Sequence, residues 1–197
     1  MYSLPTTVNV GDKTFHIRDS GDFRIMLDCF AALQDESISE DARILASLII
    51  FYEDFEEIED LPRDEDTLKA IITEMYRFFN CGSDSAPGMD MGVQLIDWER
   101  DSQMICAAIN NVANTEVRAL KNLHWWTFLG YYASVGQSML STVVSIRDKI
   151  TRGKKLEKWE QEFKRSNPEY FIWRKRDVAD IEFEKRIREQ FHKGGDK

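Results

Sequence analysis

The acidic residues Asp97, Glu99 and Asp101 are the polar side chains whose spacing first suggests chemistry, because they surround Trp98 at alternate positions. An acidic cluster near an aromatic ring can make specific polar contacts, but the spacing implies no partner acid or base. A second acidic stretch, residues 53–60, could hold a divalent cation, although a solvated acidic face explains it better. Neither group alone predicts a catalytic centre.

The other residue types that perform catalysis or bind metals occur singly. His16, His124 and His192 are far apart, and no cysteine has a neighbour at the spacing of a structural zinc site. The segment at residues 152–155, RGKK, has too few glycines for a phosphate-binding loop, and no nucleophile elbow is present. We therefore expect a protein that is not an enzyme and that uses no metal and no cofactor.

The most distinctive segment is aromatic and uncharged: LHWWTFLGYYASVG, residues 123–136. Successive residues of a helix point about 100° apart, so Trp125 and Trp126 cannot face the same direction. One of them could anchor a core with Trp98 while the other lines a groove for a partner; the alternative is that both are core residues. The candidates for partner contact are Trp98, Trp125, Trp126, Phe128, Tyr131 and Tyr132.

The uncharged run from Asn122 to Ile146 is long enough to cross a bilayer. Serine, threonine, glutamine and histidine side chains recur along it, however, and these are costly in lipid. Gly136-Gln137-Ser138 has the composition of a helix end followed by a new N-cap. The sequence therefore predicts two soluble helices that meet at Gly136, and no membrane contact.

A basic segment follows this run and is a second candidate for binding. It could contact nucleic acid or an acidic protein surface. Glutamates at positions 157, 160 and 162 are interleaved with the basic residues that follow, which favours a charged amphipathic helix or a protein partner over nucleic acid. The members of this basic patch are Arg147, Lys149, Arg152, Lys154 and Lys155.

The elements that must position these residues are mainly helical. Residues 6–18 predict a hairpin with its turn at Gly11-Asp12. Apolar residues recur at helical spacing from Phe23 to Leu33, which predicts a first helix. A capping box at Ser37 and Glu40 predicts the start of a second helix. A third helix is predicted from about Asp66 to Phe79. Further helices are expected over residues 93–113 and from about Val117 onward, after a flexible loop at residues 83–92.

We accordingly predict a mainly α fold: a compact helical domain over residues 1–155, with a small N-terminal β-hairpin, and a charged helical C-terminal extension over residues 156–197. The chain of 197 residues suits one domain with an extension. Its three cysteines are odd in number and far apart, which is typical of buried thiols in a reducing cytosol. No export signal opens the sequence.

Charge is unevenly distributed along the chain, whose formal net charge is −9. Residues 1–100 carry 8 Lys and Arg against 22 Asp and Glu, while the remainder carries 18 against 13. The two parts are therefore expected to meet different partners, or to attract each other weakly within one dipolar monomer. The overall charge argues against general affinity for nucleic acid or anionic lipid.

Several motifs in order resemble one family of small phage proteins, the gene-product-fifteen family of siphophages and prophages of Gram-positive bacteria. The resemblance rests on an aromatic–Asn–Cys–Gly turn at residues 79–82, an acidic Asp-x-Glu-x-Asp segment at 97–101, His-Trp-Trp-x-Phe at 124–128, and Arg147 in the segment that follows. It covers most of residues 12–155; residues after about Glu157 and the loop around Pro87 do not match.

By gene position, members of this family resemble tail assembly chaperones. The resemblance implies a host-cytoplasmic protein that keeps the tape-measure protein soluble and assists the tail-tube protein to polymerise around it. Two alternatives remain: a structural component of the virion tail, and a nucleic-acid-binding or regulatory phage factor. Self-association of the chain is possible in each case.

Overall fold

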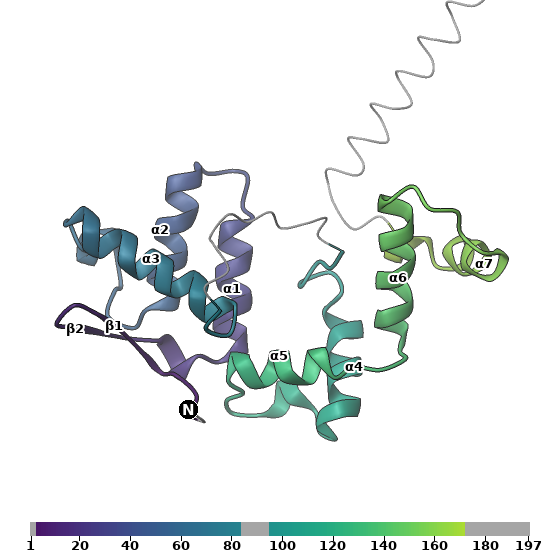
Figure 1. The fold of residues 1–197 in the computed structure, drawn as a ribbon, viewed down its shortest axis with the longest axis horizontal. Coiled ribbons are helices and arrows are strands. Elements are labelled where there is room, and N and C mark those ends of the chain that lie inside the picture. Colours follow the sequence, from purple (N-terminus) through teal and green to yellow (C-terminus); the bar gives the residue numbers. More distant parts are fainter. Residues whose placement is uncertain (1–2, 84–94, 172–197) are drawn as a thin grey trace, which may run out of the picture. The chain divides into compact units, whose positions relative to one another are not determined.

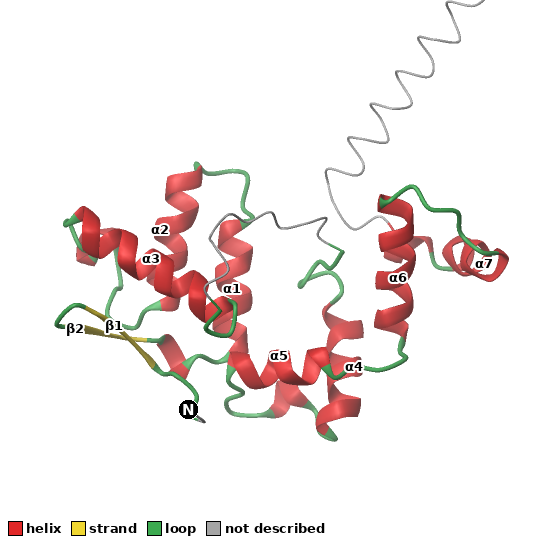
Figure 2. Cartoon of the chain, in the orientation of Figure 1, coloured by secondary structure: helices red, strands yellow, loops and turns green. Residues whose placement is uncertain are grey.

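The computed structural model describes residues 3–83 and 95–171, and over these residues the protein is mainly helical with one two-stranded antiparallel hairpin (Figures 1 and 2). This confirms the predicted fold class. The predicted flexible loop at 83–92 lies almost wholly outside the described residues, as does the extension beyond residue 171. The elements are β1 (Thr7–Val10), β2 (Lys13–His16), η1 (Arg18–Ser20), α1 (Phe23–Leu33), α2 (Glu40–Phe51), η2 (Ile58–Asp60), α3 (Glu65–Phe79), α4 (Ser102–Ala113), η3 (Val117–Ala119), α5 (Trp125–Ala133), α6 (Met139–Thr151), α7 (Lys158–Ser166) and η4 (Pro168–Phe171).

The chain folds as two compact units that are discontinuous in sequence. The first unit comprises Met1–Asp90 and Ile109–Ser134, and the second comprises Met91–Ala108 and Val135–Lys197. The predicted division of the chain at residue 155 stays a prediction.

The core of the first unit is aromatic. Phe51 lies at its centre and meets the rings of Tyr52, Phe78 and Phe79 edge to face, with centroids 4.6–5.6 Å apart. The hairpin joins this core through Phe15, whose ring contacts that of Tyr52. Such edge-to-face pairs are favoured by the quadrupoles of the rings, so the hairpin is held on the helices rather than left to stand alone.

Arg18 closes the C-terminal end of α2 in the first unit. Its guanidinium donates hydrogen bonds to the carbonyl oxygens of Ile49, Ile50, Tyr52 and Phe55, at 3.0–3.1 Å. The last carbonyls of a helix have no partner within the helix and carry its negative dipole end, so a cation is well placed there.

In the second unit α6 and α7 are joined by a partly buried ion pair. The ammonium group of Lys149 lies 2.6 Å from a carboxylate oxygen of Glu160, whose side chain is 2% exposed. The same glutamate accepts a hydrogen bond from the backbone N–H of Glu157 and so caps α7. The contact lowers the pKa of Glu160 and raises that of Lys149, so both stay charged near neutral pH.

Three predicted helix starts and one predicted burial were wrong. The aromatic helix begins at Trp125 rather than near Val117, because Leu123, just before it, bonds to the start of α1. The backbone N–H of Leu123 donates to the carboxylate of Asp22, and its carbonyl oxygen accepts the backbone N–H of Phe23. The helix predicted from residue 93 begins at Ser102, after turns held by Asp97 and Asp101. Helix α2 is capped by Ser39 and not by Ser37. The thiol of Cys81 is exposed.

Candidate partner-binding groove

The two adjacent tryptophans of α5 have different environments. Trp125 is only 1% exposed; its ring packs against Phe128, and its indole N–H donates to the carbonyl oxygen of Phe79 at 3.1 Å. Trp126 is half-buried, and its indole N–H donates to the carbonyl oxygen of Phe78 at 2.9 Å. Both indoles thus satisfy terminal carbonyls of α3, and they fasten α5 to the end of that helix.

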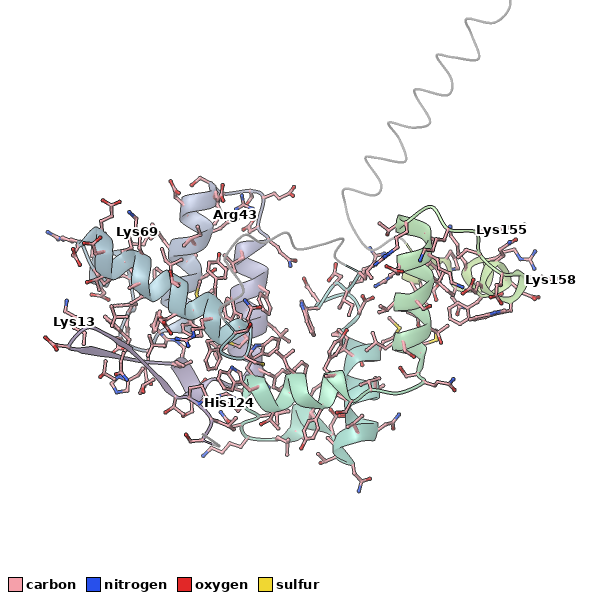
Figure 3. All side chains as sticks on the ribbon, in the orientation of Figure 1. Lys13, Arg43, Lys69, His124, Lys155 and Lys158 are labelled. Carbon is pink, nitrogen blue, oxygen red and sulfur yellow. The ribbon has the colours of Figure 1, made fainter. Side chains whose placement is uncertain are left out.

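His124 is the N-cap of α5, and its geometry defines its tautomer. Its Nδ1 accepts the backbone N–H of Trp126 at 3.1 Å, so Nε2 carries the proton and donates to the carbonyl oxygen of Pro5 at 3.0 Å. Burial lowers the pKa of this imidazole below its ordinary value, against an opposing effect of the Pro5 contact. The neutral ring therefore joins the start of the hairpin to the start of α5 (Figure 3).

Trp126 lines a groove of about 350 Å³ in the first unit. One side of the groove is formed by β1 and the residues just before it, and the other side is formed by α3, which packs beside that strand. The ring of Phe78 lies 5.7 Å from that of Trp126 and provides a second apolar surface. The lining residues are Pro5, Thr7, Val8, Asn9, Glu74, Arg77, Phe78, Gly82 and Trp126.

Gly82 makes room for the tryptophan in this groove. Its φ is 80°, in the left-handed region that glycine adopts without strain. A Cβ at this position would lie 3.2 Å from Cη2 of Trp126, closer than ordinary van der Waals contact. The glycine that ends α3 thus also fixes where the indole can lie.

The backbone of β1 presents a free edge at the groove. In the hairpin register Thr7 lies opposite His16, and the N–H and C=O of His16 are bonded away from β1, to Asp54 and Glu53. Thr7 and His16 are therefore a non-hydrogen-bonded pair, and by alternation so are Asn9 and Thr14. The N–H and C=O groups of Thr7 and Asn9 consequently point away from β2, and no hydrogen bond joins them to any other part of the described chain.

Charged groups stand on the α3 side of the groove. The guanidinium of Arg77 lies 3.4 Å from the carboxylate of Glu74 and also donates to the carbonyl oxygen of Gly82. Together with Trp126 and Phe78 they give a surface that is apolar in one part and polar in another. An extended peptide could pair its backbone with Thr7 and Asn9 and place an apolar side chain on the two rings.

The remaining aromatic candidates are placed less favourably for contact with a partner. Phe128 is 1% exposed and stacks on Phe23 with centroids 4.5 Å apart, so it is a core residue. Tyr131 and Tyr132 are half-buried on α5, and Trp98 is half-buried in the second unit. Of the six candidates, only Trp126 lines this groove.

The groove residues that sequence reasoning missed come from the strand and from α3. Glu74, Arg77 and Phe78 share one face of a helix through i, i+3 and i+4 spacing, a signal present in the sequence. Thr7 and Asn9 belong to the predicted hairpin, whose free edge was foreseeable. What could not be foreseen is that these two surfaces meet beside Trp126.

The structure separates the members of the predicted basic patch. Arg147 is fully buried, and its five N–H groups donate to the carboxylate of Asp101 and to the carbonyl oxygens of Leu95 and Tyr170. Lys149 pairs with Glu160, and Arg152 pairs with Asp148 one helical turn away. Of the five, only Lys154 and Lys155 are exposed without an ion pair to the described residues. The exposed patch is therefore smaller than the sequence pattern predicts.

The structure gives a packing role to each of two motifs on which the family resemblance rests. Asp101 of the Asp-x-Glu-x-Asp segment is the buried partner of Arg147, and the turn at Asn80, Cys81 and Gly82 ends the helix on which Trp126 rests. Within residues 3–83 and 95–171 no group of His, Cys, Asp and Glu could hold a metal ion. Over the same residues, no helix is both long and apolar enough to span a bilayer.

The fold and the groove define a mainly helical protein in which a small hairpin and an aromatic helix border one concave surface. The chain belongs to the family described as Bacteriophage Gp15 protein, whose model matches residues 2–171, and it is a bacteriophage protein. The resemblance seen in the sequence is thereby confirmed. No curated protein and no solved structure matches the chain.

Proposed function

We propose that the protein is a non-enzymatic tail assembly chaperone of the host cytoplasm, which binds the tape-measure protein and assists assembly of the tail tube. The observation that carries the proposal is the groove beside Trp126, since it offers both apolar surface and free backbone groups to one ligand. Family membership supplies the phage context, and the role in tail assembly follows the gene position of similar phage proteins.

The groove fits an extended segment of the client. A strand that pairs with β1 gains backbone hydrogen bonds that do not depend on its sequence, while the two rings select an apolar side chain. A tape-measure chain that awaits its tube exposes long apolar stretches, which would otherwise aggregate. A short contact of this kind needs no nucleotide for release, because tube subunits can compete for the same segment.

Burial of Arg147 favours this function over nucleic-acid binding. A phosphate contact requires an accessible cation, and Arg147, the first member of the predicted basic patch, has all its donors engaged inside the second unit. A structural tail component has the same sequence requirements as a chaperone, so it is distinguished by experiment.

The test is co-expression with the phage's own tape-measure protein, followed by measurement of client solubility and co-purification. We expect the wild type to keep the client soluble and Trp126→Ala to lose at least about tenfold in affinity, as expected for removal of a central aromatic anchor. Met139→Ala is the control, because Met139 is an exposed large apolar side chain of the second unit that lies in no proposed contact surface. Client that stays insoluble, with this protein present in finished particles, would instead establish a structural component.

A second variant tests the strand edge separately. Asn9→Pro removes an N–H that points away from β2, so it leaves the ladder of the hairpin intact. We expect it to bind the client more weakly than Asn9→Ala, which changes the side chain but retains the N–H. Equal affinity of the two variants would exclude strand pairing while leaving the Trp126 contact open to its own test.

A further inference from the structure

The two most exposed large apolar side chains of the described residues lie in surroundings of opposite charge. Ile58 is 58% exposed in the first unit, and Trp159 is 53% exposed in the second. An exposed apolar side chain inside a ring of charge is a common composition for a contact surface, whose centre excludes water while its rim selects the partner.

Ile58 stands in the acidic face, which we define as residues 56–60. Glu56, Glu57, Glu59 and Asp60 are all exposed, and no Lys or Arg of the described chain pairs with them. The turn is held in place, since the carboxylate of Asp60 accepts the backbone N–H groups of Glu56 and Glu57 at 3.0 and 3.1 Å. The apolar side chain and its acidic neighbours are therefore presented together.

Trp159 stands in the basic face, which we define as residues 154–159. Lys154, Lys155 and Lys158 are exposed and form no ion pair with the described residues. Figure 3 labels Lys155 and Lys158. The indole N–H of Trp159 donates to the carboxylate of Glu157 at 3.0 Å, which orients the ring. Glu160 does not oppose the lysines at the surface, because that side chain is buried against Lys149, and the face therefore holds three lysines against one exposed carboxylate, that of Glu157.

We infer that the acidic face of one copy binds the basic face of a second copy, so that the protein associates head to tail. Each copy then has one free face of each kind. A contact between two different surfaces is heterologous, and it continues into a ring or an open chain instead of stopping at a dimer. The inference is independent of the groove and of the proposed function.

Charge complementarity gives the association a clear dependence on salt. The charged rim is exposed, and the screening length falls from about 10 Å at 0.1 M salt to about 3 Å at 1 M. We expect the dissociation constant to rise at least about tenfold between these conditions, while the apolar centre is little affected.

The experiment is sedimentation velocity of the full chain up to about 100 µM, a range that detects dissociation constants typical of weak assemblies. Two variants each remove one face without creating a new charge: Ile58→Ala with Glu56→Gln and Glu59→Gln, and Trp159→Ala with Lys155→Gln and Lys158→Gln. We expect each variant alone to be monomeric, and their mixture to form a one-to-one complex and nothing larger, because only one complementary pair of faces remains.

Met139→Ala with Lys121→Gln is the matched control, since it removes an exposed apolar side chain and an exposed lysine elsewhere. It should associate as the wild type does. The inference is overturned if the wild type is monomeric at low salt, or if either face variant associates like the wild type. A monomeric wild type whose Stokes radius increases in the face variants would show that the two faces meet within one chain.

Discussion

Arg18 in the first unit and Arg147 in the second are both arginines that point inward, and the groups that compensate their charge differ. Within the described residues, Arg18 donates to main-chain carbonyl oxygens at and just beyond the end of α2, which are partial charges. Arg147 is 0% exposed and pairs with Asp101, a carboxylate that is itself nearly inaccessible. Arg18 in the first unit is thus held by partial charges of the backbone, whereas Arg147 and Asp101 in the second unit are full charges that need each other.

This difference bears on function. The stabilisation from ring packing grows with the buried area, so Trp125 can complete the core while Trp126 remains available to a ligand. The two charges of a buried ion pair cannot be separated in this way, because removing either one leaves the other buried without compensation. We therefore expect graded responses to substitution of Arg18 and of the tryptophans of α5, and an abrupt response to substitution of Arg147.

The largest expected effect is that of Arg147→Met. It leaves the carboxylate of Asp101 buried without its partner, which costs about 3–5 kcal/mol of unfolding free energy. Arg18→Met should cost about 1.5–3 kcal/mol, the contribution of hydrogen bonds from a charged donor. Urea unfolding followed by far-ultraviolet circular dichroism measures both.

The double variant Asp101→Leu with Arg147→Met separates a missing partner from missing volume. Replacing a whole buried pair by apolar side chains is often neutral, so it should recover most of the loss. A double variant as unstable as Arg147→Met alone would show that the hydrogen bonds of the two side chains to the backbone, and not their charge pairing, hold the second unit. These hydrogen bonds are those of Arg147 to Leu95 and Tyr170 and that of Asp101 with the N–H of Asp97.

The next effect compares the two tryptophans with the same substitution. Trp125→Phe removes a buried donor and leaves the carbonyl oxygen of Phe79 without it, for an expected loss of about 1–3 kcal/mol. Trp126→Phe should cost less than about 1 kcal/mol, because water can reach a half-buried site. Thermal unfolding of the two variants side by side gives the comparison; equal losses would contradict the division into core ring and groove ring.

Alanine substitutions at two glycines, compared with each other, test how closely the residues before α1 approach the end of α3. Gly21 has a φ of 79°, and a Cβ there would lie 2.7 Å from the ring of Phe78 and 3.1 Å from Nε2 of His124. Gly21→Ala should therefore cost more than the roughly 1–2 kcal/mol of a left-handed alanine alone. Gly11→Ala provides that reference, because Gly11 has a φ of 57° and no atom within 4 Å of such a Cβ.

The smallest expected effect is a pH dependence confined to the first unit. Burial holds the pKa of His124 below its ordinary value of 6.5, so the folded protein resists protonation that the unfolded chain accepts. The stability contributed by the neutral ring is therefore complete above pH 6.5, the ordinary pKa of histidine in the unfolded chain, and is lost as the pH falls from there through the lower pKa of the folded protein. His124→Asn retains a capping oxygen but does not titrate, so it should unfold with a flatter dependence on pH between about 7 and 5; an unchanged dependence would assign the effect to other groups.

The sequence predicted those features that depend on local spacing. The hairpin, the exact extent of α1, the end of α3 and the break between α5 and α6 near Gly136 all follow from turn residues and helical periodicity. The 100° helical step predicted that the two tryptophans face different directions, but it left open whether one of them lines a groove or both are core residues.

Features that depend on long-range contacts could not be predicted. Arg147 belongs to a basic run and was placed on the surface, because its partner Asp101 is 46 residues away along the chain. The late start of α5 has the same origin: residues before Trp125 pair with a segment about a hundred residues earlier. Local propensity does not report such contacts.

The central claim is that a client segment pairs with the free edge of β1 beside Trp126, and amide hydrogen exchange tests it most directly. In the free protein the N–H groups of Thr7 and Asn9 should exchange much faster than those of Val8 and Val10, which point toward β2. Binding of the tape-measure protein should slow exchange at Thr7 and Asn9 at least about tenfold, as expected for amides drawn into a ladder. A bound client that leaves these two amides exchanging at their free rates would contradict the account.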